Sequence, residues 1–70
     1  MIFTLRNQFE EKIFLSLEPE GTMLELLPDE FVKIELKSEE SPAIDLQIQK
    51  YNNTVCIAIW PDKGQYEILD

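Results

Sequence analysis

Hydrophobic and polar residues alternate along most of this chain with a period of two, which is the spacing of side chains on the two faces of a β-strand. The helical spacing of 3.6 residues does not describe the apolar positions. Short segments rich in Pro, Gly, Asn and Asp interrupt the alternation, and these residues favour turns. The pattern therefore predicts an all-β domain with seven short strands, at about residues 2–5, 12–17, 22–27, 31–37, 44–50, 54–60 and 65–69.

The turns can be tested against the alternation, because each turn fixes which residues face one another. Asn52-Asn53 is typical of a two-residue hairpin loop with a type I′ turn. The four residues 18–21 form a second loop between apolar runs. The registers that follow place apolar residues opposite apolar residues in both hairpins, with the pairs Tyr51–Thr54, Ile48–Ile57 and Leu46–Ile59 in one, and Leu17–Thr22, Leu15–Leu24 and Ile13–Leu26 in the other.

Two further turns extend the same scheme. A three-residue loop at 28–30 predicts the pairs Leu26–Val32 and Leu24–Ile34, with Glu25 against Lys33 on the other face. The turn at 61–64 brings Ile59 near Tyr66 and Ile57 near Ile68. The long turn 38–42 is the expected place for the chain to cross between sheets. We therefore expect one domain, residues 1–70, folded as a sequential antiparallel meander that forms a β-sandwich or a partly closed barrel.

The inward positions of these strands make up the expected core. A chain of 70 residues buries only roughly 60% of its unfolded surface, so there is little room for a deep substrate cavity as well. The expected core residues are Phe3, Leu5, Ile13, Leu15, Leu17, Leu24, Leu26, Val32, Ile34, Leu36, Ile44, Leu46, Ile48, Val55, Ile57, Ile59, Tyr66 and Ile68.

The charge of the chain restricts its partners. Fourteen acidic residues against six basic ones give a formal net charge of −8. Nucleic acids and anionic membranes are bound through Lys and Arg, so both are disfavoured. The acidity either keeps a small protein soluble or favours a basic protein partner. No signal peptide, apolar membrane-spanning stretch or pair of cysteines is present, which makes the cytoplasm the expected location.

Few residues in the chain carry catalytic chemistry. There is no His, which removes the commonest general base and metal ligand. Cys56 lies within a predicted strand without a neighbouring cation in sequence, so we interpret it as a structural or exposed thiol. Most carboxylates fall in turns, where we expect them to be solvated, and no stretch matches a calcium loop. We expect no catalytic residue, no cofactor and no metal site, and hence a protein that is not an enzyme.

Several large apolar residues fall on the outward face of the predicted strands, among mostly polar neighbours. Aromatic and Met side chains in polar surroundings are typical of interaction hot spots. These residues either contact a protein partner, close a second small core, cover the ends of the barrel, or line a small-ligand pocket. The candidate interaction residues are Phe14, Met23, Leu27, Phe31 and Trp60.

Three short motifs in the first half of the chain resemble a pattern found in small bacterial all-β proteins of unknown activity. The pattern reads Phe-x-Leu-x-Asn, then Leu-Glu-Pro-x-Gly, then Leu-x-Pro-x-Glu, and it often has Gly where this chain has Asp29. The resemblance implies a β-sandwich-like fold and no activity, and no functional residues follow from it. The motifs lie at residues 3–7, 17–21 and 26–30.

Three functions stay open at the level of sequence. The first is a non-enzymatic, acidic protein-interaction module, in its sharpest form an inhibitor or immunity-type protein for a basic partner. The second is a structural subunit that associates with itself as a homodimer through an edge strand. The third is a small-ligand-binding domain. Substitution of the candidate residues, sedimentation at several concentrations and a ligand screen would separate them.

Overall fold

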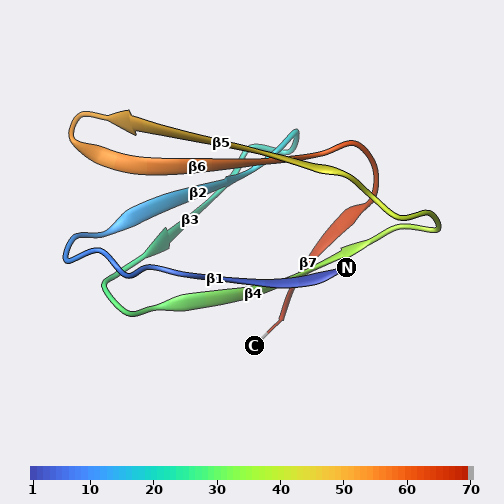
Figure 1. Ribbon diagram of the computed structural model, residues 1–70, viewed down its shortest axis with the longest axis horizontal. Helices are drawn as coiled ribbons and strands as arrows, with labels where there is room; N and C mark the ends of the chain where they lie inside the picture. The colour runs from blue at the N-terminus through green and yellow to red at the C-terminus, as the bar shows by residue number, and fades with distance from the viewer. Residues whose placement is uncertain (70) are drawn as a thin grey trace.

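The fold is all-β, as a computed structural model of the chain shows for residues 1–69 (Figure 1). The seven predicted strands are confirmed. The predicted end of the domain, Asp70, lies outside the described residues. No described residue is helical, so no helix in this part is long and apolar enough to cross a membrane. The strands are β1 (Ile2–Arg6), β2 (Ile13–Leu17), β3 (Thr22–Leu26), β4 (Phe31–Lys37), β5 (Ile44–Tyr51), β6 (Thr54–Pro61) and β7 (Gln65–Leu69).

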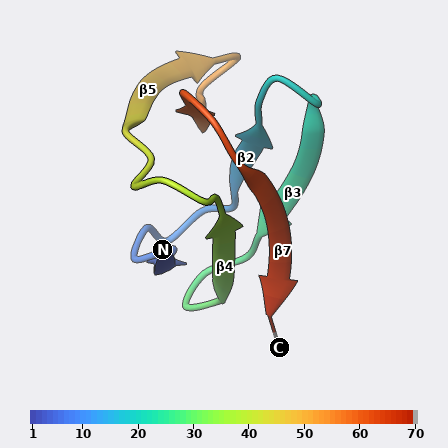
Figure 2. The ribbon, with the colours of Figure 1, turned by 90° about the vertical axis from the view of Figure 1, so that its right-hand side faces the viewer.

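The strands form two separate sheets. One has three strands in the order β1-β4-β7, and the other has four in the order β3-β2-β6-β5. The two sheets lie in different layers in both views (Figures 1 and 2). Strands β2 and β6 are parallel, with Leu15 opposite Ile57, and the other paired strands are antiparallel.

Both predicted hairpins within the four-stranded sheet are confirmed, register included. Strand β2 pairs with β3 through Leu15–Leu24, and β5 pairs with β6 through Ile48–Ile57. Asn52 and Asn53 have φ angles of 49° and 64°. Positive φ at both central residues is what a type I′ turn requires, and Asn tolerates it.

The predicted sequential antiparallel meander is wrong at two of the four turns, between β1 and β2, which lie in different sheets, and in the parallel pairing of β2 with β6. Strand β4 does not pair with β3, and β7 does not pair with β6; instead β4 lies between β1 and β7 in the other sheet. Lys33 therefore faces Thr4 and not Glu25. The predicted crossing at residues 38–42 is confirmed, because β4 and β5 belong to different sheets, but three further connections cross as well.

The reason for this arrangement is that each sheet has one apolar face to bury. If β4 continued the first sheet, its apolar face would need a separate cover. In the other layer, Ile34 contacts Leu17 and Ile59 of the four-stranded sheet, and all three are almost completely buried. The turns at 28–30 and 61–64 reverse the chain and also carry it across to the opposite layer.

The core lies between the two sheets and agrees with most of the predicted list. Buried residues of the four-stranded sheet contact partly buried residues of the three-stranded one in two adjoining clusters. Ala58 is also buried, which the sequence pattern did not predict because it placed Ala58 on the outer face. The buried hydrophobic residues are Ile13, Leu15, Leu17, Leu26, Ile34, Leu36, Ala58 and Ile59.

Three residues of the predicted core are exposed. Leu46 and Ile48 are 51% and 70% exposed, and Ile68 is also exposed. All three have inward-facing partners in the register, so alternation assigned their face correctly. They lie on β5 and β7, which are edge strands, and for β5 there is the further reason that three strands cannot cover the full width of four. Facing inward at an edge is therefore not the same as being buried.

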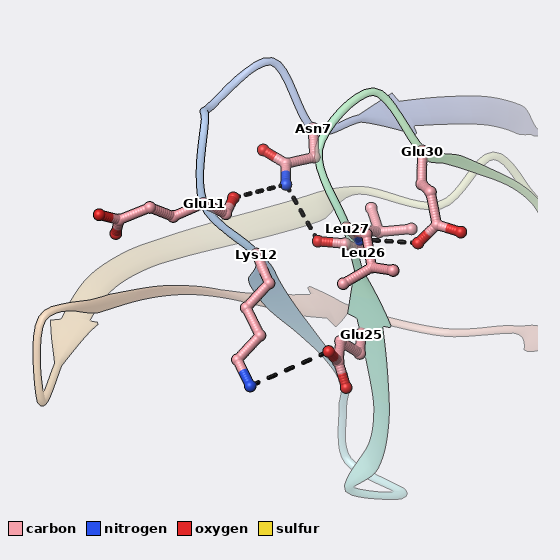
Figure 3. A network of polar contacts seen from close by, with 7 residues as sticks. All are labelled: Asn7, Glu11, Lys12, Glu25, Leu26, Leu27 and Glu30. Carbon is pink, nitrogen blue, oxygen red and sulfur yellow. Dashed lines mark hydrogen bonds and ion pairs between the residues drawn. The ribbon is translucent and has the colours of Figure 1, made fainter.

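Asn7 holds the loops at one end of the molecule together (Figure 3). Its side chain is fully buried. The Nδ2 group donates to the carbonyl oxygens of Glu11 at 2.8 Å and Leu26 at 3.0 Å, and Oδ1 accepts from the N–H of Phe9 at 2.9 Å. The Asn7 amide thus joins the loop after β1 to the end of β3, and no hydrogen-bonding atom of its side chain is left unpaired.

Candidate functional site

The outer face of the four-stranded sheet carries a shallow apolar hollow of ≈ 420 Å³. Phe14 lies directly opposite Cys56 in the parallel pair of strands, and Cys56 lies opposite Gln49 of β5. The hollow follows this row of side chains across the sheet. Its lining residues are Phe14, Met23, Gln49, Tyr51, Asn52, Thr54 and Cys56.

The concave shape of this face comes from differences in side-chain size. In the next row across the sheet, Ser16 and Ala58 occupy the two central strands and are both buried, although they point away from the core. Met23, at the edge of the same row, lies opposite Ser16 and is exposed. Small residues in the middle and large ones at the edge make the surface concave, which is the shape that protein and ligand sites share.

Acidic groups lie along this face, one beside the hollow and two toward Trp60. Glu25 lies opposite Phe14, Asp45 lies opposite Trp60, and the Glu18 carboxylate accepts a hydrogen bond from the Ser16 hydroxyl at 2.5 Å. Lys12 is the basic residue nearby: its Nζ lies 4.0 Å from the Glu25 carboxylate and 5.6 Å from the centre of the Phe14 ring. A cation above the Phe14 ring is thus already part of this surface.

The outer face of the three-stranded sheet has a different character. Arg6, Lys33 and Lys37 lie there among acidic residues, as the alternation with the buried positions of β4 shows. Lys37 forms an ion pair with Glu67, and that hydrogen bond and charge raise the pKa of the lysine. Positive and negative groups are mixed on this face, whereas Lys12 is accompanied by Glu18, Glu25 and Asp45 on the outer face of the other sheet.

The structure brings three of the five candidate residues onto one face. Phe14 and Met23 line the hollow together, from neighbouring strands. Trp60 lies on the same face of β6, two alternations beyond Cys56, and is 39% exposed. The three residues therefore form an apolar surface with the hollow at one end and Trp60 at the other.

Leu27 and Phe31 do not join this surface. Phe31 begins β4 in the three-stranded sheet, opposite Arg6, whose guanidinium carbon lies 4.8 Å from the centre of the Phe31 ring. Leu27 lies in the turn before it, where its backbone N–H donates to the Glu30 carboxylate at 2.7 Å. Because the chain crosses between sheets at this turn, Phe31 lies in the other sheet, and neither residue lines the hollow beside Phe14.

Sequence reasoning missed the other half of the hollow. Tyr51, Thr54 and Cys56 join Phe14 only through the parallel pairing of β2 with β6. The turn of a hairpin fixes which residues of its two strands face one another. A parallel pair of distant segments has no such turn, so its register cannot be predicted in this way. The available signal was the alternation itself, because Cys56 and Gln49 lie next in sequence to the expected core residues Ile57 and Ile48 and so face outward.

A second hollow, of ≈ 370 Å³, lies at the end of the molecule between the loop after β1 and the β5–β6 turn. It is lined by acidic and basic residues, including Glu10, Lys12 and Lys50, beside the exposed ring of Phe9. Among residues 1–69, no three His, Cys, Asp or Glu side chains lie close enough together to hold a metal ion.

Comparison with known proteins adds no relative: no protein-family model, no curated protein and no solved structure matches the chain.

Proposed function

We propose that this protein is a non-enzymatic interaction module that binds a basic protein segment on the outer face of its four-stranded sheet. The observation that carries the proposal is the apolar hollow between Phe14, Met23 and Tyr51, with the Glu25 carboxylate beside it and those of Glu18 and Asp45 farther along the same face. We further propose that the two sheets pack as a β-sandwich, the fold that the resemblance to small bacterial all-β proteins implies, and that the protein works in the cytoplasm.

The shape and chemistry of the face support a protein segment as the ligand. Met and aromatic side chains form the apolar part, and such residues give most of the binding energy in protein interfaces. The hollow is open to one side of the sheet and is lined by two amides and two hydroxyls as well as by apolar groups. One large side chain of a partner fits there, with flanking residues lying along the sheet.

The charges on this face support a basic partner. Glu18, Glu25 and Asp45 lie on the face or at its rim, against the single cation of Lys12. A Lys or Arg of the partner can take the place that Lys12 holds above Phe14, between the ring and the Glu25 carboxylate. In its sharpest form, the module is an inhibitor that covers the basic site of another protein.

Selection from a random peptide library displayed on phage tests this function. We expect the wild-type protein to enrich peptides that combine Lys or Arg with an aromatic residue or Met. Substitution of a central anchor residue typically weakens binding by about 30-fold. Phe14→Ala should therefore lower the affinity for the selected peptides by roughly that factor, and Met23→Ala should lower it by less. Binding should also weaken as salt is added.

The matched control is Leu27→Ala, which removes an apolar side chain that is 48% exposed, against 55% for Met23, and that does not line the hollow. Each variant is checked for folding by its thermal melt, because Phe14 is partly buried. Enrichment of acidic peptides, or peptides that bind folded Phe14→Ala and Met23→Ala as well as they bind the wild type, would refute the proposal.

A further inference from the structure

Strand β5 has the most exposed edge of the molecule. It is the outermost strand of the four-stranded sheet and pairs only with β6 in the described part of the chain (Figure 1). All of its residues except Ile44 are exposed, on both faces. At eight residues it is also longer than the other edge strands, β1, β3 and β7, which have five each.

The backbone of this edge is available for hydrogen bonding. In a hairpin with a two-residue loop, the pair beside the turn exchanges both hydrogen bonds, and the pattern then alternates along the strand. Tyr51–Thr54 is that pair here. Tyr51, Gln49, Gln47 and Asp45 therefore direct their backbone groups toward β6, whereas Lys50, Ile48, Leu46 and Ile44 direct theirs away from the sheet.

The features that normally protect an edge strand are weak on β5. Natural edges are short, carry central charges or proline, or contain a bulge. The register of β5 with β6 is continuous, and residues 46–49 carry no charge. Leu46 and Ile48, whose backbone groups point outward, also expose about half or more of their side chains. An apolar edge of this kind is a site for adding another strand.

The distribution of charge indicates which strand would be added. Residues 44–61, which form the β5–β6 hairpin, contain one acidic residue, Asp45, and one basic residue, Lys50. The whole formal charge of −8 therefore lies outside this hairpin. Two copies of an acidic protein repel one another, and the neutral hairpin is where that repulsion is weakest.

We propose that two copies of this chain associate through antiparallel pairing of their β5 strands around a two-fold axis at Gln47. This pairing sets Leu46 opposite Ile48 of the second copy, and Ile48 opposite Leu46, so that the apolar residues match in both directions. It also uses every outward backbone group from Ile44 to Lys50. The result is one continuous eight-stranded sheet, in which each β5 edge is satisfied by the other copy.

The assembly stops at two copies. A two-fold interface uses the same surface on both partners, so no second β5 edge stays free. The new outer edges of the sheet are the two β3 strands, which are short and carry Glu25. The outer faces then lie side by side, with two apolar hollows in one sheet, but this association does not depend on either hollow having a partner.

Sedimentation equilibrium from low micromolar to near-millimolar concentration tests the association. We expect a monomer–dimer equilibrium that Ile48→Lys weakens by about tenfold or more, because each dimer would place two new charges against apolar side chains. Leu27→Lys makes the same change in charge at an exposed apolar residue away from the edge and should leave the equilibrium unchanged. A strict monomer throughout this range, or a dimer that Ile48→Lys does not weaken, would overturn the proposal.

A cysteine cross-link tests the register. At the two-fold axis the Gln47 residues form a non-hydrogen-bonded pair, whose Cα atoms lie about 4.5 Å apart, within the range of a disulfide. On a Cys56→Ala background, Gln47→Cys should form a covalent dimer on oxidation. Asp45→Cys should not, because residue 45 faces residue 49 of the other copy. Cross-linking that is equal at both positions would reflect random collision and count against the register.

The effect of salt separates this inference from the proposed function. Added salt screens the repulsion between two acidic copies and should strengthen the dimer, whereas it should weaken binding of a basic segment. Phe14→Ala and Met23→Ala change the outer face and leave the β5 edge intact, so they should not affect dimerisation. If the wild-type protein forms the dimer but enriches no basic peptides, the proposed function has failed and the dimer stands. If it binds such peptides but stays monomeric, the dimer has failed and the proposed function stands.

Discussion

Asn7 is the residue on which most of the connections at one end of the molecule depend. Besides its side-chain bonds to Glu11, Leu26 and Phe9, its backbone N–H donates to the Glu30 carbonyl and its carbonyl accepts from the N–H of Asp29, both at 2.9 Å. The sequence marks Asn7 only as a turn residue after the first strand. Its burial follows from loops that are distant along the chain, so local pattern could not predict it.

Substitution of Asn7 should therefore be costly. Asn7→Ala leaves the Leu26 carbonyl buried without its donor, and we expect a loss of about 2–3 kcal/mol in the free energy of unfolding. Asn7→Asp keeps the acceptor for Phe9 but places an anionic oxygen toward two carbonyl oxygens, so it should cost at least as much at neutral pH. Urea unfolding measures both variants, and a midpoint equal to that of the wild type in Asn7→Ala would contradict this role.

At the scale of elements, the turns decide how much of the fold can be predicted. The Asn52-Asn53 turn and the loop at 18–21 join neighbouring strands, and their registers followed from sequence alone. The turns at 28–30 and 61–64 look similar in sequence but lead into the other sheet. Alternation identifies the buried face of a strand and says nothing about its neighbours. The two hairpin parts of the candidate site, Phe14 with Met23 and Tyr51 with Thr54, were therefore each predictable, but their meeting through the parallel pairing of β2 with β6 was not.

Gly64 shows how the last of these turns is built. It has a φ of +103°, and a Cβ placed there would lie 2.8 Å from the Lys37 carbonyl oxygen and 3.1 Å from the Leu36 side chain. The turn between β6 and β7 thus packs directly against the end of β4. Gly21, in the β2–β3 loop, has a φ of +77°, but its Cβ would meet no atom within 4 Å in the described chain.

These two glycines form a matched pair. Gly21→Ala should lose about 1 kcal/mol of stability, because its cost is the left-handed backbone alone. Gly64→Ala carries the same cost and also a contact with backbone that cannot move away, so it should lose roughly 1–2 kcal/mol more. Thermal melts of both variants test the difference, and equal losses would show that the β6–β7 turn can shift away from β4.

At the scale of the whole molecule, Tyr66 links the two sheets by hydrogen bonds. Its hydroxyl, on β7 of one sheet, lies 2.8 Å from the Glu18 carbonyl oxygen and 2.9 Å from the Ile59 carbonyl oxygen of the other. Burial, followed by the charges of Glu20 and Glu18, raises the pKa of Tyr66 above its ordinary value of 10.0. The folded state therefore favours the neutral hydroxyl.

This shift has a defined effect on stability. A raised pKa in the folded state means that the contribution of Tyr66 is complete below pH 10.0 and is lost as pH rises through the folded value. Tyr66→Phe should cost about 1 kcal/mol at neutral pH, through its lost hydrogen bonds. Above pH 10.0 the gap between the two proteins should narrow. Lys37 titrates in both, so the difference between their thermal melts isolates Tyr66; a gap independent of pH would contradict the assignment.

The path of the chain through both layers also has a consequence for how fast the protein folds. The two hairpins are local and can form within microseconds. The parallel pairing of β2 with β6 and both pairings of β4 join segments that are far apart along the chain. Contacts of that kind must wait for large loops to close, which places small all-β proteins in the range of milliseconds to seconds. In that interval the β5–β6 hairpin has already formed while its apolar inner face is still uncovered, because the three-stranded sheet that covers this face forms later.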